Sequence, residues 1–169
     1  MIKNAVKNLI EKVSLKPLIK RILRKFWNAS SKDIASLQQQ HQLIIVNQWK
    51  DWKMKGISPY KSIQEAGFRC YSEFEEDGII LYLMTMLGIS KGTVVEICCG
   101  TGDECMAANL IINHGFKGFL FDGNHHLIKA SKLFYSQQKD CRLYKPYIAK
   151  EWITAENVNT ILKESGCPR

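Results

Sequence analysis

The chain has 169 residues, 46% of them hydrophobic and 24% charged, which is enough for one globular core and too little for two ordinary domains. Lys and Arg total 24 against 16 Asp and Glu, but eight of the cations and one anion lie in residues 1–27, so +7 of the net +8 is there and +1 remains for residues 28–169. We therefore assign the basicity to an N-terminal arm, and the nearly neutral remainder argues against a nucleic-acid partner.

Residues 1–27 are predicted to form a basic amphipathic helical arm. Apolar residues recur at helical spacing from Ile2 to Val13 and again beyond Pro17, where we expect a break. Lysines interrupt the arm before an apolar run reaches the roughly 18 residues of a membrane span or the 7–15 of a secretory signal, which predicts a cytoplasmic protein. Two roles stay open for the arm: peripheral contact with the anionic inner face of a membrane, or packing on its own domain or a second subunit.

Residues 28–70 are predicted to be a helical lead-in. A polar break at residues 28–33 precedes a glutamine-rich helix that should end near Gly56. The sequence Ser72-Phe-Glu-Glu75 then has the form of a capping box, and the helix that it predicts should stop at Gly88.

Residues 71–169 carry the pattern of an α/β domain. β-branched and apolar runs alternate with helical stretches, which favours parallel strands joined by helices. The predicted strands cover residues 93–99, 118–122 and 142–149, and the predicted helices cover residues 103–113, 125–137 and 155–164. The predicted fold class is a doubly wound parallel sheet, incomplete with about three strands and preceded by N-terminal helices.

A nucleoside-binding turn is predicted where the first strand meets its helix. Gly100 and Gly102 would let a ligand approach the backbone, and the open amides of the following helix favour negatively charged groups. Asp122 ends the next strand 22 residues after Gly100, which suits an acid that accepts hydrogen bonds from ribose hydroxyls. Cys105 stands where a dinucleotide fold would place its third glycine, and no Gly-Lys-Ser/Thr phosphate loop follows Gly100, so both of those alternatives are less favoured.

The segment Val94-Val-Glu-Ile-Cys-Cys-Gly-Thr-Gly102 resembles the first motif of class I S-adenosylmethionine-dependent methyltransferases, whose domain is Rossmann-like. The resemblance implies S-adenosylmethionine as cofactor, with Glu96 near its methionine end and Asp122 on its ribose. Cys98 departs from the motif because it stands where a glycine or alanine is usual. The cofactor-binding residues expected from the resemblance are Glu96, Cys98, Gly100, Gly102, Asp122, Gly123 and Trp152, the last beside the adenine.

A closer likeness covers roughly residues 59–165. It includes Gly67-Phe-Arg, Tyr71-Ser-Glu-Phe-Glu-Glu-Asp-Gly78, Asn109-Leu-Ile-Ile-Asn-His-Gly115 and Ile153-Thr-Ala-Glu-Asn157. This combination is similar to a bacterial FkbM-like group of methyltransferases associated with polysaccharide and surface-glycan pathways, which implies a small-molecule or glycan acceptor. The family's sheet has seven strands, so we expect a truncated, cofactor-binding half whose open sheet edge is covered by another chain. The alternative is a non-catalytic remnant or interaction module that acts through its basic arm.

No residue is assigned as a catalytic base or metal ligand. His125 and His126 lack a carboxylate at a suitable spacing and are expected on the surface, and Asp77 is expected to act as a first-turn helix anion rather than as a contact of the cofactor's amino group. The six cysteines contain no C-x-x-C pair and are expected to be reduced thiols. Trp152 is as consistent with a half-buried core residue as with an adenine contact.

Overall fold

The computed structural model describes residues 17–168, with side chains from residue 36 onward. The elements in chain order are α2 (Pro17–Met54), the short 3₁₀ helix η1 (Ile63–Ala66), α3 (Glu76–Leu87), β1 (Thr93–Ile97), α4 (Met106–His114), β2 (Lys117–Asp122), α5 (His125–Gln137), β3 (Tyr147–Lys150) and α6 (Val158–Glu164). The chain divides into two compact units, one that ends at Leu43 and one that begins at Ile44.

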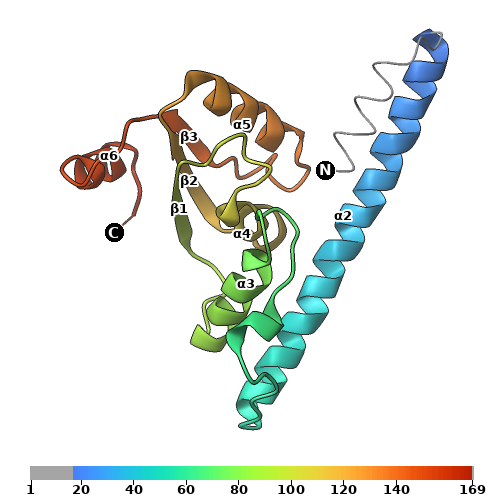
Figure 1. Ribbon diagram of the computed structural model, residues 1–169, viewed down its shortest axis with the longest axis vertical. Coiled ribbons are helices and arrows are strands. Elements are labelled where there is room, and N and C mark those ends of the chain that lie inside the picture. Colours follow the sequence, from blue (N-terminus) through green and yellow to red (C-terminus); the bar gives the residue numbers. More distant parts are fainter. Residues whose placement is uncertain (1–16, 169) are drawn as a thin grey trace. The chain divides into compact units, whose positions relative to one another are not determined.

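The second unit contains a three-stranded sheet in the order β1-β2-β3, with both pairs parallel. Helices α4 and α5 lie on one side of this sheet and α6 lies on the other (Figure 1). The prediction of an α/β fold with about three parallel strands is therefore confirmed for the part of the chain that the structure describes, and the sequential strand order is a new finding.

The main core fills the space between the sheet and helices α4 and α5. Leu120 of β2 and Ile148 of β3 pack there with Ile111 and Ile112 of α4 and Ile128 of α5. Burying a side chain of this size removes most of its apolar surface from water, which stabilises the fold by about 1.5–3 kcal/mol for each residue. β2 is covered on both faces, because Phe119 and Phe121, which point away from Leu120, are also buried.

A second, aromatic cluster joins the end of α2 to α3. Trp49 is fully buried, donates from its indole Nε1 to the hydroxyl of Tyr60 at 2.9 Å, and meets the ring of Tyr82 edge to face at 5.2 Å between centroids. Leu81 of α3 and Phe116 pack against the same cluster. This cluster fixes α3 just ahead of β1, where the site begins.

Two predictions about the N-terminal helices meet different outcomes. A helix does start at Pro17, whose fixed φ and missing N–H suit a first helical turn, but it continues to Met54, so the predicted break at residues 28–33 is wrong. The backbone stays helical through this polar stretch, so the capping residue types there mark no helix start. The predicted amphipathic stretch from Ile2 to Val13 lies outside the described residues.

The start of α3 also differs from its prediction. Ser72 does accept a backbone hydrogen bond, but the donor is the N–H of Asp77 at 3.2 Å, and the helix begins at Glu76 rather than just after Ser72. The residue responsible is Asp77, whose buried Oδ2 accepts the N–H groups of Cys70, Tyr71 and Ser72 at 2.6–2.9 Å and folds this segment into a loop. Gly88 ends α3 in the left-handed region, as predicted.

Candidate functional site at the carboxyl ends of the strands

The turn after β1 departs from ordinary backbone geometry at three residues. Cys98, Gly100 and Gly102 have φ values of 64°, 57° and 88°, in the region that residues with a Cβ rarely adopt. A glycine would adopt this conformation at the position of Cys98 without strain, because it has no Cβ. Cys98 is exposed and takes this conformation despite its side chain.

The two glycines of the turn serve different purposes. A Cβ added to Gly100 would meet no atom within 4 Å, so open space lies over this residue. A Cβ on Gly102 would lie 2.9 Å from the hydroxyl of Ser131 and 3.0 Å from the ring of Tyr135, both on α5. Gly100 therefore leaves room for a ligand, whereas Gly102 allows α5 to pack closely against the turn.

Asp122 lies beside this turn, as its spacing from Gly100 predicts. Its Oδ2 accepts the N–H of Gly100 at 3.1 Å, and its Oδ1 accepts the N–H of Asn124 at 2.8 Å. Each carboxylate oxygen can accept two hydrogen bonds, so each keeps capacity for one further donor. Paired ribose hydroxyls are donors of the kind that such a carboxylate accepts.

Glu96 points from β1 to the start of α4 and occupies the amides that the sequence led us to expect free. Its carboxylate accepts the N–H groups of Met106 at 3.1 Å and Ala107 at 2.6 Å, together with the thiol of Cys105 at 2.9 Å. The N–H of Ala108 is used by the carbonyl of Cys105. The prediction of open amides at this helix is wrong, because a carboxylate from the neighbouring strand already satisfies the helix terminus.

Trp152 lies over Gly123 at the ends of β2 and β3. The ring atom Cε3 of Trp152 would be 2.5 Å from a Cβ on Gly123, so the absence of a side chain there permits the contact. The indole is 78% exposed, which excludes the half-buried core role. Asn157 holds the segment after β3 in place, since it donates to the carbonyl of Trp152 at 2.9 Å and accepts from the N–H of Thr154 at 2.8 Å.

The buried thiols below the turn remain protonated near neutral pH. Burial, with a contribution from the Asp122 carboxylate, raises the pKa of Cys99 to about 11. Burial and the Glu96 carboxylate raise the pKa of Cys105 far above its usual value, and burial also raises the pKa of Tyr135, whose hydroxyl donates to the sulfur of Cys105 at 3.7 Å. Cys99 and Cys105 therefore offer no thiolate nucleophile and act as packed donors.

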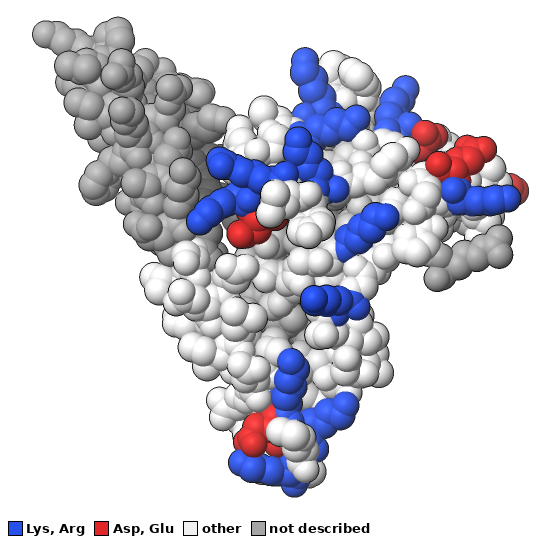
Figure 2. All heavy atoms as spheres, turned by 180° about the vertical axis from the view of Figure 1, so that it is seen from behind, with Lys and Arg blue, Asp and Glu red and all other residues white. Residues whose placement is uncertain are grey.

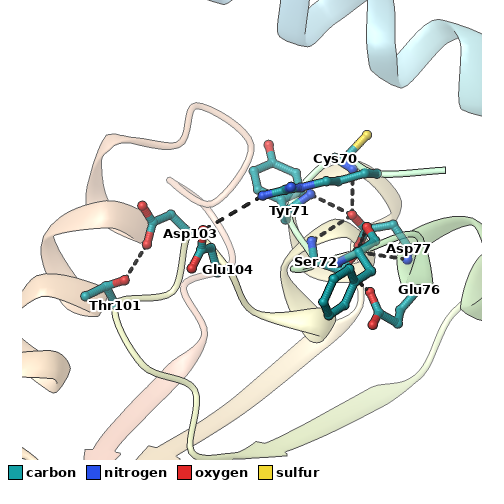
Figure 3. Close-up of polar contacts among 10 residues, drawn as sticks. Cys70, Tyr71, Ser72, Glu76, Asp77, Thr101, Asp103 and Glu104 are labelled. Atoms are coloured by element: carbon teal, nitrogen blue, oxygen red, sulfur yellow. Dashed lines mark hydrogen bonds and ion pairs between the residues drawn. The ribbon is translucent and has the colours of Figure 1, made fainter. Parts of the chain in front are cut away.

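A loop from the segment before α3 lies against the glycine turn (Figure 3). The guanidinium of Arg69 approaches the carboxylate of Glu104 at 3.8 Å, and Thr101 donates to Asp103 on the same turn. Asp77 lies in the first turn of α3, as predicted, and its buried carboxylate also accepts three backbone N–H groups from the loop before that helix. A shallow depression lined by Arg69, Phe74 and Ile79 adjoins the loop.

The remaining candidates are brought together only in part. His125 and His126 are exposed at the start of α5, in agreement with their predicted surface location. Within the described residues, no group of three or more His, Cys, Asp or Glu side chains is placed to hold a metal ion.

The sequence predicts the residues of this site but not the residues that hold them in place. The contact of Glu96 with α4 spans ten residues and has no local signal. Asn157 carried a readable signal, because Asn is a preferred residue at helix starts and α6 begins at Val158. The helix predicted over residues 155–164 therefore starts three residues later than expected.

Comparison with known proteins adds no relative: no protein-family model, curated protein or solved structure matches the chain. Among the helices that the structure describes, none combines the length and the apolar character needed to cross a membrane.

Proposed function

We propose that the carboxyl ends of the strands bind a nucleoside cofactor, S-adenosylmethionine. We propose further that the chain is the cofactor-binding part of a Rossmann-like methyltransferase. The observation that carries this proposal is the convergence of three strand ends. The Gly100 amide bonds to Asp122, and Gly123, the residue after Asp122, lies under the exposed indole of Trp152. Crevices at the carboxyl ends of parallel strands are where open α/β sheets bind their ligands.

The residues present fit the chemistry of that cofactor. Asp122 retains acceptor capacity for ribose hydroxyls, Gly100 leaves open space above the turn, and Trp152 offers a flat apolar surface to an adenine ring. Glu96 acts indirectly, since it holds α4 against β1 and so fixes the turn that follows β1. The cofactor would supply an electrophilic methyl group, and the residues named here bind and orient it.

The acceptor of that methyl group is proposed to be a small molecule or glycan by resemblance alone. No described side chain is assigned to proton transfer. The alternative, a binding module without turnover, is distinguished by measuring cofactor binding and methyl transfer together. Binding of the cofactor without methyl transfer to any candidate acceptor would favour the module.

Cys98 provides a direct test because its exposed thiol lies on the turn that the cofactor would cover. Bound S-adenosylhomocysteine is expected to slow alkylation of Cys98 by iodoacetamide, while Cys167, beyond α6, reacts at an unchanged rate. Isothermal titration measures the affinity in parallel. Asp122→Asn should weaken binding roughly tenfold or more, because it removes charge-assisted hydrogen bonds.

Asp103→Asn is the matched control, since Asp103 is an exposed acid on the same turn and is bonded only locally, by Thr101. It should leave the affinity within about twofold of the unmodified chain. Circular dichroism must show both variants folded. Absence of heat and of Cys98 protection in the folded, unmodified chain would refute the proposed cofactor site.

A further inference from the structure

At the amino-terminal end of the sheet, opposite the candidate site, each strand has one lysine at or near its first residue. Lys91 lies two residues before β1, Lys117 begins β2 and Lys145 lies two residues before β3, and all three are exposed. The N–H of Lys117 bonds to the carbonyl of Gly92 at 2.9 Å, which places the first two strand starts side by side. Pro146 lies 3.0 Å from the position of a Cβ on Gly118, which places the starts of β2 and β3 side by side as well.

The loop that leads into β3 adds exposed apolar side chains to these cations. Leu143 and Tyr144 are 87% and 81% exposed, and Lys139, Arg142 and Lys145 flank them. Asp140 is the one anion in the loop. We call the seven residues Lys91, Lys117, Lys139, Arg142, Leu143, Tyr144 and Lys145 the amino-end surface.

Charge is segregated toward this surface. The side chains of residues 36–168 include 14 cations and 14 anions, yet the amino-end surface holds five of the cations, and Asp140 is the one exposed anion in the loop that carries three of them. On the face drawn in Figure 2, Lys and Arg outnumber Asp and Glu and are spread from its lower tip to its upper part. Glu73, Glu75, Glu76 and Glu104 gather instead around Arg69, on the loops beside the candidate site.

We propose that the amino-end surface docks on an anionic lipid bilayer, with Leu143 and Tyr144 inserted among the headgroups. Cations on flexible stems around a projecting aliphatic and aromatic pair are the composition of interfacial membrane segments. Anionic headgroups complement the cations, and the acyl boundary takes up the leucine. A nucleic acid is less suitable, because Leu143 can neither stack on a base nor donate a hydrogen bond.

The proposal is independent of the cofactor, since the two surfaces lie at opposite ends of the same parallel strands. It also differs from docking through residues 1–27, which carry their own charge of +7. The full chain must therefore be tested with variants that alter the amino-end surface alone.

Vesicle sedimentation of the full chain can test this surface with two triple variants of equal composition. Lys139→Gln/Lys145→Gln/Leu143→Ser removes two cations and one leucine from the amino-end surface. Lys129→Gln/Lys132→Gln/Leu133→Ser removes the same groups from the exposed side of α5, where Leu133 is 59% exposed. All six residues are exposed, so neither variant removes core packing.

The unmodified chain is expected to bind vesicles of phosphatidylcholine and phosphatidylserine but not of phosphatidylcholine alone. The amino-end variant should lose about tenfold or more in partition coefficient, and the α5 variant should stay within about twofold. Leu143→Ser alone should reduce the binding that survives at high salt, since the apolar contribution is not screened. Equal binding by both triple variants, or no binding by the unmodified chain, would overturn the proposal.

Discussion

Cys98 shows how one residue can violate a local backbone preference while the turn around it keeps its form. Its φ of 64° brings Cβ close to the following carbonyl, at a cost of roughly 1–2 kcal/mol. The neighbouring glycines at 100 and 102 adopt similar φ values without that cost. The turn is held by hydrogen bonds to residues outside it, chiefly from the N–H of Gly100 to the carboxylate of Asp122.

Cys98→Gly should therefore stabilise the chain by about 1 kcal/mol, because glycine reaches the left-handed region freely while gaining some entropy in the unfolded state. Urea unfolding measures the difference. Cys98→Ala is the control, since it removes the thiol but keeps the Cβ, and it should leave the free energy of unfolding nearly unchanged. A stabilisation by alanine equal to that by glycine would mean that the thiol, and not the backbone, was responsible.

Single residues also show where prediction from sequence succeeds. Gly100, Gly102 and Asp122 were predicted to meet, and the Gly100 amide does bond to Asp122, because strand ends in a parallel pair lie at the same edge. Glu96 was predicted beside the turn, and its contacts with Met106 and Ala107 were not foreseen. A carboxylate can satisfy a helix terminus or face a ligand, and sequence spacing does not distinguish these environments.

At the scale of whole elements, boundaries were predictable where they depend on neighbouring residues. Helix α5 runs from His125 to Gln137 as predicted, and the Asn124 side chain accepts the N–H of His126 at its start. Helix α4 begins at Met106, three residues later than predicted, because its terminus is set by Glu96 from another strand. Contacts of this kind depend on the folded sheet and leave no pattern in the local sequence.

Gly123→Ala tests the contact between two elements at the candidate site. The added Cβ would lie 2.5 Å from the Trp152 ring, so the indole must swing away, which its exposure allows at a cost in stability below about 1 kcal/mol. We expect the affinity for S-adenosylhomocysteine to fall roughly tenfold while the free energy of unfolding changes little. Calorimetric titration and urea unfolding together provide this comparison.

Gly92→Ala is the control for that variant, because its new Cβ would meet only the Phe116 ring, at an ordinary 3.4 Å, on the opposite edge of the sheet. Both its affinity and its stability should match those of the unmodified chain. An unchanged affinity in Gly123→Ala would remove Trp152 from the proposed adenine contact.

At the scale of the whole molecule, the central strand β2 is well buried, whereas β1, β3 and α6 are less covered. Phe119, Leu120 and Phe121 of β2 are almost entirely inaccessible, whereas α6 contains no buried residue. In the described sheet β1 and β3 are each paired on one side only, and Val95 and Ile97 of β1 remain partly exposed. A second chain that covers the unpaired edge stays a prediction. Val95 and Ile97 share the sheet face of Phe119 and Phe121, opposite the main core, so their exposure concerns that face rather than the edge.

Amide hydrogen exchange should follow this gradient of burial. We expect β2 to exchange slowest, β1 and β3 at intermediate rates, and α6 fastest, because opening α6 exposes little apolar surface. Exchange followed by peptide mass spectrometry measures the order. Protection of α6 equal to that of β2 would show that a further contact covers this helix.

The parallel direction of the strands also determines how far any docked chain would hold its site from a membrane. A strand of five residues such as β1 spans about 16 Å, so the glycine turn would stand about that height above a bilayer that contacts the lysines at the other end. At that height a lipid headgroup is out of reach. On the function proposed above, a methyl acceptor would have to reach the turn from solution or on a long, extended chain.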